Sequence, residues 1–323
     1  MSQTNQSAQR RLWYKNSSTA STLTILLILI IMCVALSIAA PAFLKTSNLL
    51  STARNFSAIA VAGFGVSIVI LTGNIDISIG SIYGLAGVTV ALLMKSGWAF
   101  LPAVLAGMVV GGLCGLANGL LVVYLRLPSY IATLGMMQIV RGICYILTQG
   151  YPVSGMAESF KWVGQGQLMG IPIPIYFMVL FAVIFAIFRN QTKTGRRIFA
   201  LGGNEEATRI SGVNTRNLKI LCFVLSGVCA AFAGVINASK VGVAQPTAGN
   251  GFEMDAIASV VIGGSSMAGG VGTVVGTLIG SAIMGVLRNA LVLLSVDSYW
   301  QTLVMGVVII FAVTIDQVRK ARR

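Results

Sequence analysis

The chain has 323 residues, of which 56% are hydrophobic and 9% charged, and this leaves too little polar surface for a protein that is soluble in water. Its net charge of +14 arises from 22 Lys and Arg against 8 Asp and Glu. No basic residue falls in an aromatic-interleaved soluble module, so the charge does not indicate binding to nucleic acid.

The charged residues cluster along the chain and leave apolar runs that can each cross a bilayer, which takes about 20 helical residues. The sequence therefore predicts an all-α polytopic membrane protein with about ten transmembrane helices, at 23–43, 55–72, 77–94, 98–123, 130–148, 170–188, 219–239, 256–268, 272–294 and 298–315. With the N-terminus inside, 15 of the 22 basic residues lie on the inner side, 5 on the outer side and 2 within spans. Because Lys and Arg are retained in the cytoplasm, both termini are predicted to be cytoplasmic.

The N-terminal part of the chain precedes the first predicted span. Residues 1–22 are rich in Ser, Thr, Gln and Asn and are predicted to form a cytoplasmic tail. The apolar run from Leu23 to Ala40 exceeds the 7–15 residues of a signal-peptide core, so we interpret it as an uncleaved anchor. The remaining predicted organisation is a single transmembrane domain over 23–318, with a cytoplasmic loop at 189–218, and a basic tail at 319–323.

A polar break bounded by glycines separates the second and third predicted spans, at Gly73-Asn74-Ile75-Asp76-Ile77-Ser78-Ile79-Gly80-Ser81. A carboxylate is costly in a bilayer, and it usually caps a broken helix or lines an aqueous path. Asp76 is expected to cap the third span by accepting the amide of Ser78 or Ile79. Capping a helix and lining a path are compatible, and we expect Asp76 to do both.

The longest cytoplasmic connection, Arg189 to Arg216, contains a short helix signal. Asn204 is a good N-cap, Glu205 and Glu206 lie in the first turn, and Gly212 stands at the position of a C′ residue. Glu205 and Arg209 have the i,i+4 spacing of a favourable ion pair. The predicted helix has about two turns and no apolar stripe that could lie in lipid. It is therefore either a simple surface turn or a contact for a partner outside the membrane.

Two Gly-rich polar stretches lie around the predicted eighth span. Residues 245–255 form a turn-rich outer stretch that contains Gln245 and Thr247. Residues 263–270 contain Ser265 and Ser266 between two Gly-Gly pairs. Glycines in a membrane allow close helix approach and leave carbonyls that a polar lumen could use. These stretches therefore indicate mainly close packing of helices, and to a lesser extent the lining of a translocation pathway.

Weak internal similarity indicates an inverted repeat of two halves. Four residues of the first half echo four of the second, namely Gly115, Gly119, Arg126 and Tyr130 against Gly276, Gly280, Arg288 and Tyr299. In the ten-span topology the two stretches cross the membrane in opposite directions, as an inverted repeat requires.

Several kinds of chemistry are excluded by residues and motifs that the sequence lacks. There is no His, which removes Ser-His-Asp triads and His-based metal sites. The five Cys lie in apolar runs without a CxxC pair and are interpreted as small buried side chains. No Lys follows a Gly, so the chain has no GxxxxGK[ST] phosphate loop. We expect no catalytic residue, no metal and no cofactor, and the chain is predicted not to be an enzyme.

Three long segments carry a resemblance to a known family. They are GNIDISIGSIYGLAGVTVALL (73–93), TKTGRRIFALGGNEEATRISGVNTRNLKI (192–220) and AQPTAGNGFEMDAIASVVIGGSSMAGGVGTVVGTLIG (244–280). They resemble the membrane permease subunit of the ribose-type sugar ABC importers, over nearly the whole chain from about residue 40 onward. The family commonly has Gly in place of Asn74, and Leu and Val in place of Ile77 and Ile79.

The resemblance implies a set of partners and a location. Two permeases form the pore, as a homodimer or a heterodimer, two ABC ATPase subunits dock beneath them, and an extracytoplasmic sugar-binding protein delivers a monosaccharide, ribose or a similar sugar. The implied location is the bacterial cytoplasmic (inner) membrane. ATP hydrolysis would then take place on the partner chain.

The resemblance also assigns roles to residues. The short capped helix would be the coupling helix that docks in a cleft of the ATPase, through Gly202, Gly203, Asn204, Glu205, Glu206, Ala207, Arg209 and Gly212. The break after Gly73 would lie near the translocation path, whose expected lining is Asn74, Asp76, Ser78, Ser81, Gln245, Thr247, Ser265 and Ser266. A neutral sugar needs such uncharged hydrogen-bond partners.

Two other transporter classes share this pattern. A branched-chain amino acid ABC permease has the same overall plan. A secondary transporter coupled to protons or sodium could use Asp76 as its ion site and would need no ATPase. An intramembrane enzyme is disfavoured, because Asp76, Asp255 and Asp297 are far apart along the chain.

Overall fold

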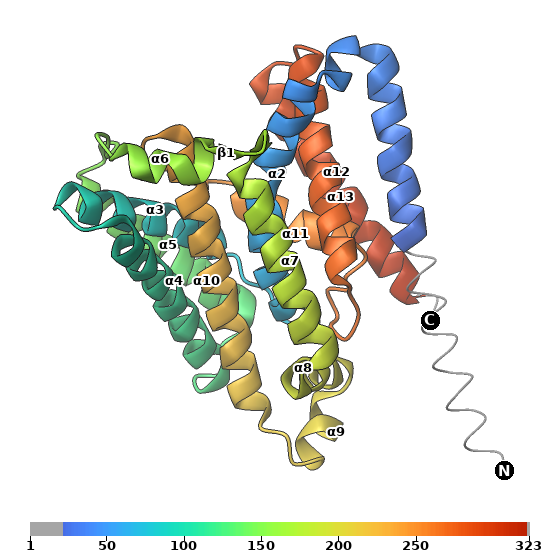
Figure 1. The fold of residues 1–323 in the computed structure, drawn as a ribbon. Coiled ribbons are helices and arrows are strands. Elements are labelled where there is room, and N and C mark those ends of the chain that lie inside the picture. Colours follow the sequence, from blue (N-terminus) through green and yellow to red (C-terminus); the bar gives the residue numbers. More distant parts are fainter. Residues whose placement is uncertain (1–21, 322–323) are drawn as a thin grey trace.

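The computed structural model describes residues 22–321 and shows a bundle of helices (Figure 1). The first helix is Thr22–Ala39. It is followed by η1 (Pro41–Leu44), α2 (Thr46–Leu71), α3 (Ile79–Lys95), α4 (Phe100–Val123), α5 (Ser129–Thr148), α6 (Glu158–Gln165), β1 (Gln167–Leu168), β2 (Ile171–Pro172), α7 (Ile173–Gln191), α8 (Lys193–Gly203), α9 (Glu205–Ile210), α10 (Thr215–Val241), α11 (Phe252–Ile262), α12 (Val274–Leu293) and α13 (Ser298–Ala321).

Each of the ten predicted spans coincides with a helix of the described residues, which confirms an all-α polytopic membrane protein. Seven of these helices are long and apolar enough to cross a membrane. Two others, α3 and α11, have 17 and 11 residues and begin after breaks in the chain. α3 starts inside the bundle, at the buried Ile79, whereas α11 starts next to the exposed Gly251.

Several helix ends differ from the predicted spans. α2 begins at Thr46 rather than at 55, and α13 continues to Ala321, into the predicted basic tail. The physical reason is that Lys and Arg mark where lipid ends, whereas a helix can continue beyond the lipid. The remainder of the predicted tails, 1–21 and 322–323, lies outside the described residues. The outer helix α6, the β1–β2 hairpin and the helix α8 were not predicted.

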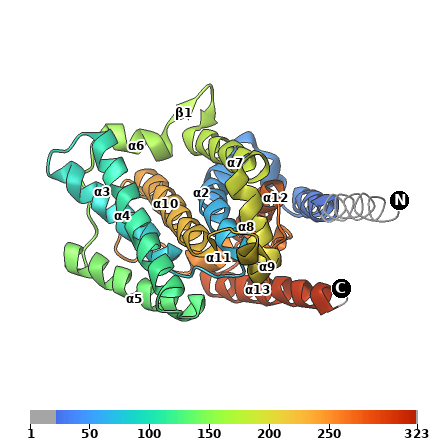
Figure 2. The same cartoon turned by 90° about the horizontal axis from the view of Figure 1, so that it is seen from below.

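The centre of the bundle is formed by α2 and α10 (Figure 2). Every residue of α2 from Ser57 to Leu71 is buried. Glycines on neighbouring helices bring their backbones very close: a Cβ at Gly234 would lie 2.0 Å from the Tyr83 carbonyl oxygen, and one at Gly115 would lie 2.2 Å from that of Phe223. Small residues at helix interfaces therefore take the role that the sequence predicted for them.

The two halves of the chain pack in the same order. In the first half, α3 and α4 pack against α10, and in the second half α11 and α12 pack against α2. α3 contacts α4 and α5 in the way that α11 contacts α12 and α13. The correspondence pairs α4 with α12, which run in opposite directions, in agreement with the inverted repeat. It does not match Arg126 with Arg288, because Arg126 lies in the turn after α4 and Arg288 lies inside α12.

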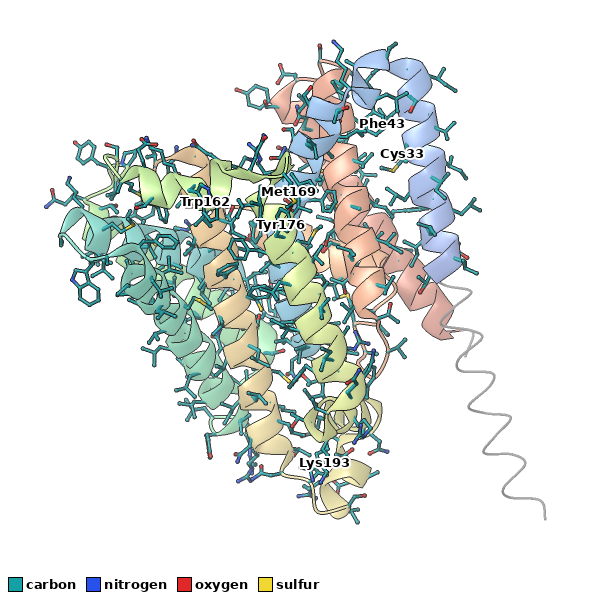
Figure 3. All side chains as sticks on the ribbon, viewed as in Figure 1. Cys33, Phe43, Trp162, Met169, Tyr176 and Lys193 are labelled. Carbon is teal, nitrogen blue, oxygen red and sulfur yellow. The ribbon has the colours of Figure 1, made fainter. Side chains whose placement is uncertain are left out.

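The two ends of the bundle differ in charge and in aromatic content. α8 and α9 form the end that we call inner, and it contains Lys193, whereas Trp162 and Tyr176 lie toward the opposite, outer end (Figure 3). Trp162 is exposed, as is typical of aromatic residues at a membrane surface. A bridge between Val153 and Ala244 ties the outer loops together.

Candidate translocation path and coupling segment

The break between α2 and α3 is organised around the carboxylate of Asp76. Its Oδ1 accepts the backbone N–H of Ser78 at 3.1 Å and the Ser78 hydroxyl at 2.6 Å. Its Oδ2 accepts the hydroxyl of Ser226, on α10, at 2.8 Å. The Asn118 amide, on α4, donates to the Ser78 oxygen at 2.8 Å. The expected bond from the Ser78 amide to Asp76 is formed, but the N-cap residue of α3 is Ser78 and no side chain caps that helix, so Asp76 holds the turn before α3. The network also joins the break to α4 and α10.

The other polar residues of the break have local roles. Asp76 and Ser78 are fully buried, so neither faces open solvent in this conformation. The half-buried Asn74 donates its amide to the Thr72 carbonyl and hydroxyl oxygens, at 3.2 and 2.9 Å, and so stabilises the turn that ends α2. Ser81 is buried one turn into α3, and its hydroxyl has no hydrogen-bond partner among the described residues.

The outer loop between α10 and α11 is held by Arg141, a residue of α5 that sequence reasoning did not select. One nitrogen of its guanidinium donates to the carbonyls of Pro246 and Ala248 at 2.5 and 2.8 Å, and another donates to Gly80 at 3.3 Å. Gln245 and Thr247 are exposed on this loop. A charged residue inside a membrane span usually has a partner or a function. The position of Arg141 within a predicted span could therefore have identified it from sequence.

A small hollow lies between α3 and α10 on the outer side, and it includes Gln245. Tyr83, Asn237 and Ala248 also line it, so an aromatic face and two amides meet there. The hollow is far smaller than the roughly 300–1,000 Å³ of ligand pockets, so it is not a complete binding site.

An ion pair joins two residues that the sequence left separate. Asp255, on α11, accepts a charged hydrogen bond from Arg288, on α12. The aspartate side chain is 7% exposed and the arginine side chain is 51% exposed. Asp255 is far from the other aspartates along the chain, and its partner Arg288 was not identified from sequence. The two residues are distant in sequence but lie on neighbouring helices of one half.

The second Gly-rich stretch forms the turn between α11 and α12 at the inner end. Ser265 is fully buried, and Ser266 is half-buried and closes the turn by donating its N–H to the Val271 carbonyl at 3.0 Å. The eight predicted path residues therefore do not line one continuous cavity. Gln245 and Thr247 lie on the outer loop, Asp76, Ser78 and Ser81 lie in the interior, and Asn74, Ser265 and Ser266 belong to turns near the inner end.

The predicted coupling segment consists of two short helices, α8 and α9, that meet at Asn204. The Asn204 side chain accepts the Ala207 N–H at 2.9 Å, as expected of an N-cap. Gly212 has a φ of +77° and donates its N–H to the Arg209 carbonyl, while Val213 donates to that of Thr208. These two bonds form a Schellman motif, which confirms the predicted end of the helix.

The ion pairs of α9 differ from the predicted one. Arg209 pairs with Glu206 at 2.6 Å, and Glu205 reaches across to Lys219, on α10, at 2.7 Å. The hydrogen bond that Arg209 donates to the Glu206 carboxylate raises the pKa of Arg209. The expected pair of Glu205 with Arg209 is therefore not formed, because Lys219 offers Glu205 a partner that local spacing cannot reveal. Apart from Thr208, the residues of α9 are exposed, including Ala207 and the 77% exposed Ile210.

Comparisons with known proteins identify the class of this molecule. The family model "Branched-chain amino acid transport system / permease component" matches residues 48–313. The ribose import permease protein RbsC of Escherichia coli (strain K12) is 41% identical over 90% of this chain and 92% of its own length. RbsC of Bacillus subtilis (strain 168) is 41% identical over 91% of this chain and 92% of its own length.

A further relative is the D-allose transport system permease protein AlsC of Escherichia coli (strain K12), which is 38% identical over 91% of this chain and 90% of its own length. No solved structure matches the chain. The family model and these relatives together cover the break, the outer loop and the coupling segment. The chain belongs to the branched-chain amino acid transport system permease family and, within it, to the ribose-type ABC permeases.

Proposed function

We propose that this chain forms the translocation pathway of an ABC importer for a monosaccharide, ribose or a similar sugar. The observation that supports this most directly is that relatives named for ribose and allose are 38% to 41% identical over nine-tenths of the chain. An L-arabinose ABC transporter permease of Azospirillum brasilense, 33% identical over 93% of the chain, extends the series of sugars.

The chemistry of the outer side suits a neutral sugar. The hollow beside α3 and α10 offers Tyr83, Asn237 and Gln245, which supply an aromatic face and uncharged hydrogen-bonding groups. The carboxylate of Asp76 is fully buried and already accepts three hydrogen bonds. Asp76 therefore acts through the shape of the α2–α3 break. The remaining polar residues of the proposed path, Asn74, Ser78, Ser81, Thr247, Ser265 and Ser266, support it from the turns and from the interior.

Energy for uphill uptake comes from a separate ABC ATPase that docks on the coupling segment. The chain has no phosphate loop of its own. At the inner end, α9 presents exposed side chains with both helix ends capped. α9 buries only Thr208 against the rest of the permease, so its other side chains are free to contact the ATPase.

The other members of the importer follow from the same class. A second permease copy, a homodimer in the simplest case, closes the pathway. An extracytoplasmic sugar-binding protein delivers substrate to the outer loops. The whole assembly resides in the bacterial cytoplasmic (inner) membrane.

The substrate is tested by reconstituting the permease in liposomes with its ATPase and its binding protein, and by measuring ATP-dependent uptake of labelled ribose, allose, arabinose and leucine. We expect uptake of a sugar and none of leucine. Uptake of leucine alone would instead support the branched-chain amino acid class. Uptake by the permease alone in a proton or sodium gradient would contradict the ABC mechanism.

Docking is tested with the double substitution Asn204→Ala and Glu205→Lys. It removes the cap of α9, which contributes about 1 kcal/mol, and it reverses a first-turn charge. It also breaks the exposed pair of Glu205 with Lys219 at the start of α10, but it changes no residue of a span. We expect normal membrane abundance, loss of copurifying ATPase and loss of substrate-stimulated ATP hydrolysis.

A matched control is available at the other end of the molecule. Glu158 also lies in the first turn of a short helix, α6, and forms an exposed pair with Lys161 at 2.5 Å. Glu158→Lys should leave ATPase copurification unchanged. If the double variant binds ATPase like the wild type, the docking element lies elsewhere.

A further inference from the structure

Three parts of the chain meet at one backbone junction at the inner end. They are the end of α8 at Gly202, the last turn of α2 at Leu71, and the turn between α11 and α12 at Gly269 and Gly270. The Gly270 N–H donates to the Leu71 carbonyl at 2.9 Å. α8 ends one residue before Asn204, so the junction lies directly behind the exposed helix α9.

The junction has no room for a side chain at Gly202. A Cβ at this position would lie 1.7 Å from the Leu71 carbonyl oxygen and 2.4 Å from the Gly270 nitrogen. Real Cβ atoms essentially never approach closer than 3.0 Å, so α8 and α2 would have to separate by more than 1 Å. Both contacts are to backbone, which cannot turn away as a flexible side chain can.

The opposite side of the junction also requires glycine. Gly269 and Gly270 have φ angles of +91° and +71°, where L side chains are strained. A Cβ on Gly269 would lie 2.9 Å from the Gly202 carbonyl oxygen and 2.9 Å from the Gly73 nitrogen. The turn between α11 and α12 therefore touches the coupling segment and the start of the α2–α3 break at once.

Arg189 ties the same turn to the coupling segment. Its side chain is 4% exposed, it donates to the Gly272 carbonyl, and its guanidinium lies 4.6 Å from the ring centre of Phe199, on α8. Around the junction, Leu71, Ile198 and Leu201 are packed in one apolar cluster. A displacement of α8 cannot be absorbed locally, because close-packed interiors transmit strain.

We propose that Gly202 is a positioning residue that transmits movement of the docked α9 to the α2–α3 break through its contact with Leu71 and Gly270. The proposal rests on the function proposed above. From Leu71 the chain passes through Gly73 directly to Asp76, whose carboxylate holds α4 and α10 through Ser78 and Ser226. Closure of the ATPase thus reaches the interior of the permease along one short backbone path.

The test compares Gly202→Ala with Gly135→Ala in the complete importer. Both changes replace a helical glycine by a better helix former, but a Cβ at Gly135, on α5, meets nothing within 4 Å. Gly135→Ala should match the wild type in abundance, ATPase copurification and uptake. Gly202→Ala should keep at least half of the copurifying ATPase, yet lower uptake per ATP hydrolysed at least tenfold.

Gly73→Ala serves as a second variant if Gly202→Ala reaches the membrane poorly. Gly73 has a φ of +73°, and its Cβ would make only an ordinary contact, at 3.4 Å, with the Ala268 carbonyl. This substitution strains the backbone of the α2–α3 break without separating α8 from α2. We expect the variant to retain ATPase docking and to lower uptake per ATP hydrolysed at least threefold.

Three results would overturn the proposal. They are wild-type coupling in well-expressed Gly202→Ala, loss of docking in that variant, and equal losses in Gly135→Ala. Where Gly202→Ala is poorly expressed, wild-type coupling in Gly73→Ala also overturns the proposal. Failure of the function proposed above has a different signature, because the wild-type permease itself would then bind no ATPase.

Discussion

Replacing Asp76 by Ala removes the acceptor of three buried hydrogen bonds at the α2–α3 break. The Ser78 amide is left without a partner, which costs about 1–3 kcal/mol when the group is buried. The hydroxyls of Ser78 and Ser226 lose bonds to a charged group, but each can rotate toward another acceptor. Together the loss is about 3–5 kcal/mol, a large part of the roughly 5–15 kcal/mol that stabilises a typical domain.

The expected result for Asp76→Ala is therefore a loss of assembly together with transport. Membrane abundance, the thermal unfolding temperature in detergent and uptake per membrane-inserted molecule should be measured on the same preparations. We expect abundance and the unfolding temperature to fall clearly. An unchanged unfolding temperature would contradict the buried network as the origin of the effect.

Asp76→Asn separates geometry from charge. The amide oxygen can still accept from the Ser78 N–H and hydroxyl, and the amide nitrogen can donate to the Ser226 oxygen, which lies 2.8 Å from the carboxylate in the native protein. We expect abundance and uptake within about twofold of wild type, because each hydrogen bond is weakened but none is lost. Normal abundance with abolished uptake would show that the ionised carboxylate itself acts in transport, as an ion-coupled carrier would require.

Three further predictions follow from other contacts. Arg141→Leu frees the carbonyls of Pro246, Ala248 and Gly80 and should lower uptake per inserted molecule at least tenfold, whereas Arg141→Lys should retain part of it; equal uptake in both would show that the outer loop is held by other groups. Asp255→Asn should destabilise the protein by about 1–3 kcal/mol, because it removes a charged partner of the half-exposed Arg288, and a double-mutant cycle with Arg288→Gln should show a coupling energy above zero in thermal unfolding. Glu206→Ala should change the free energy of unfolding by less than about 1 kcal/mol, because its pair with Arg209 is exposed, and a large fall in unfolding temperature would contradict this.

The helices of the chain could be predicted from sequence because they depend on local properties. Apolar runs between charges correspond to ten helices, and the excess of Lys and Arg on one side indicates the inner end. The caps at Asn204 and Gly212, and the bond from the Ser78 amide to Asp76, join residues two to five positions apart. Such contacts depend on backbone geometry within one turn, so spacing alone reveals them.

Contacts between distant segments were decided by tertiary packing. Ser226 lies 150 residues from Asp76, and Arg141 lies 105 residues from Pro246. Even within the coupling segment, Glu205 pairs with Lys219 across 14 residues rather than with the nearby Arg209. The sequence shows that these groups are polar and that a bilayer penalises them, but not which partner each one meets.

The junction at Gly202 shows the same division most clearly. From sequence, Gly202 and Gly203 are two adjacent glycines with the same local environment. In the folded protein Gly202 lies against the backbones of Leu71 and Gly270, whereas a Cβ on Gly203 would meet nothing within 4 Å. The difference arises because helix packing in a membrane brings together backbones from distant parts of the chain, and the permitted size of a side chain depends on that approach rather than on its neighbours in sequence.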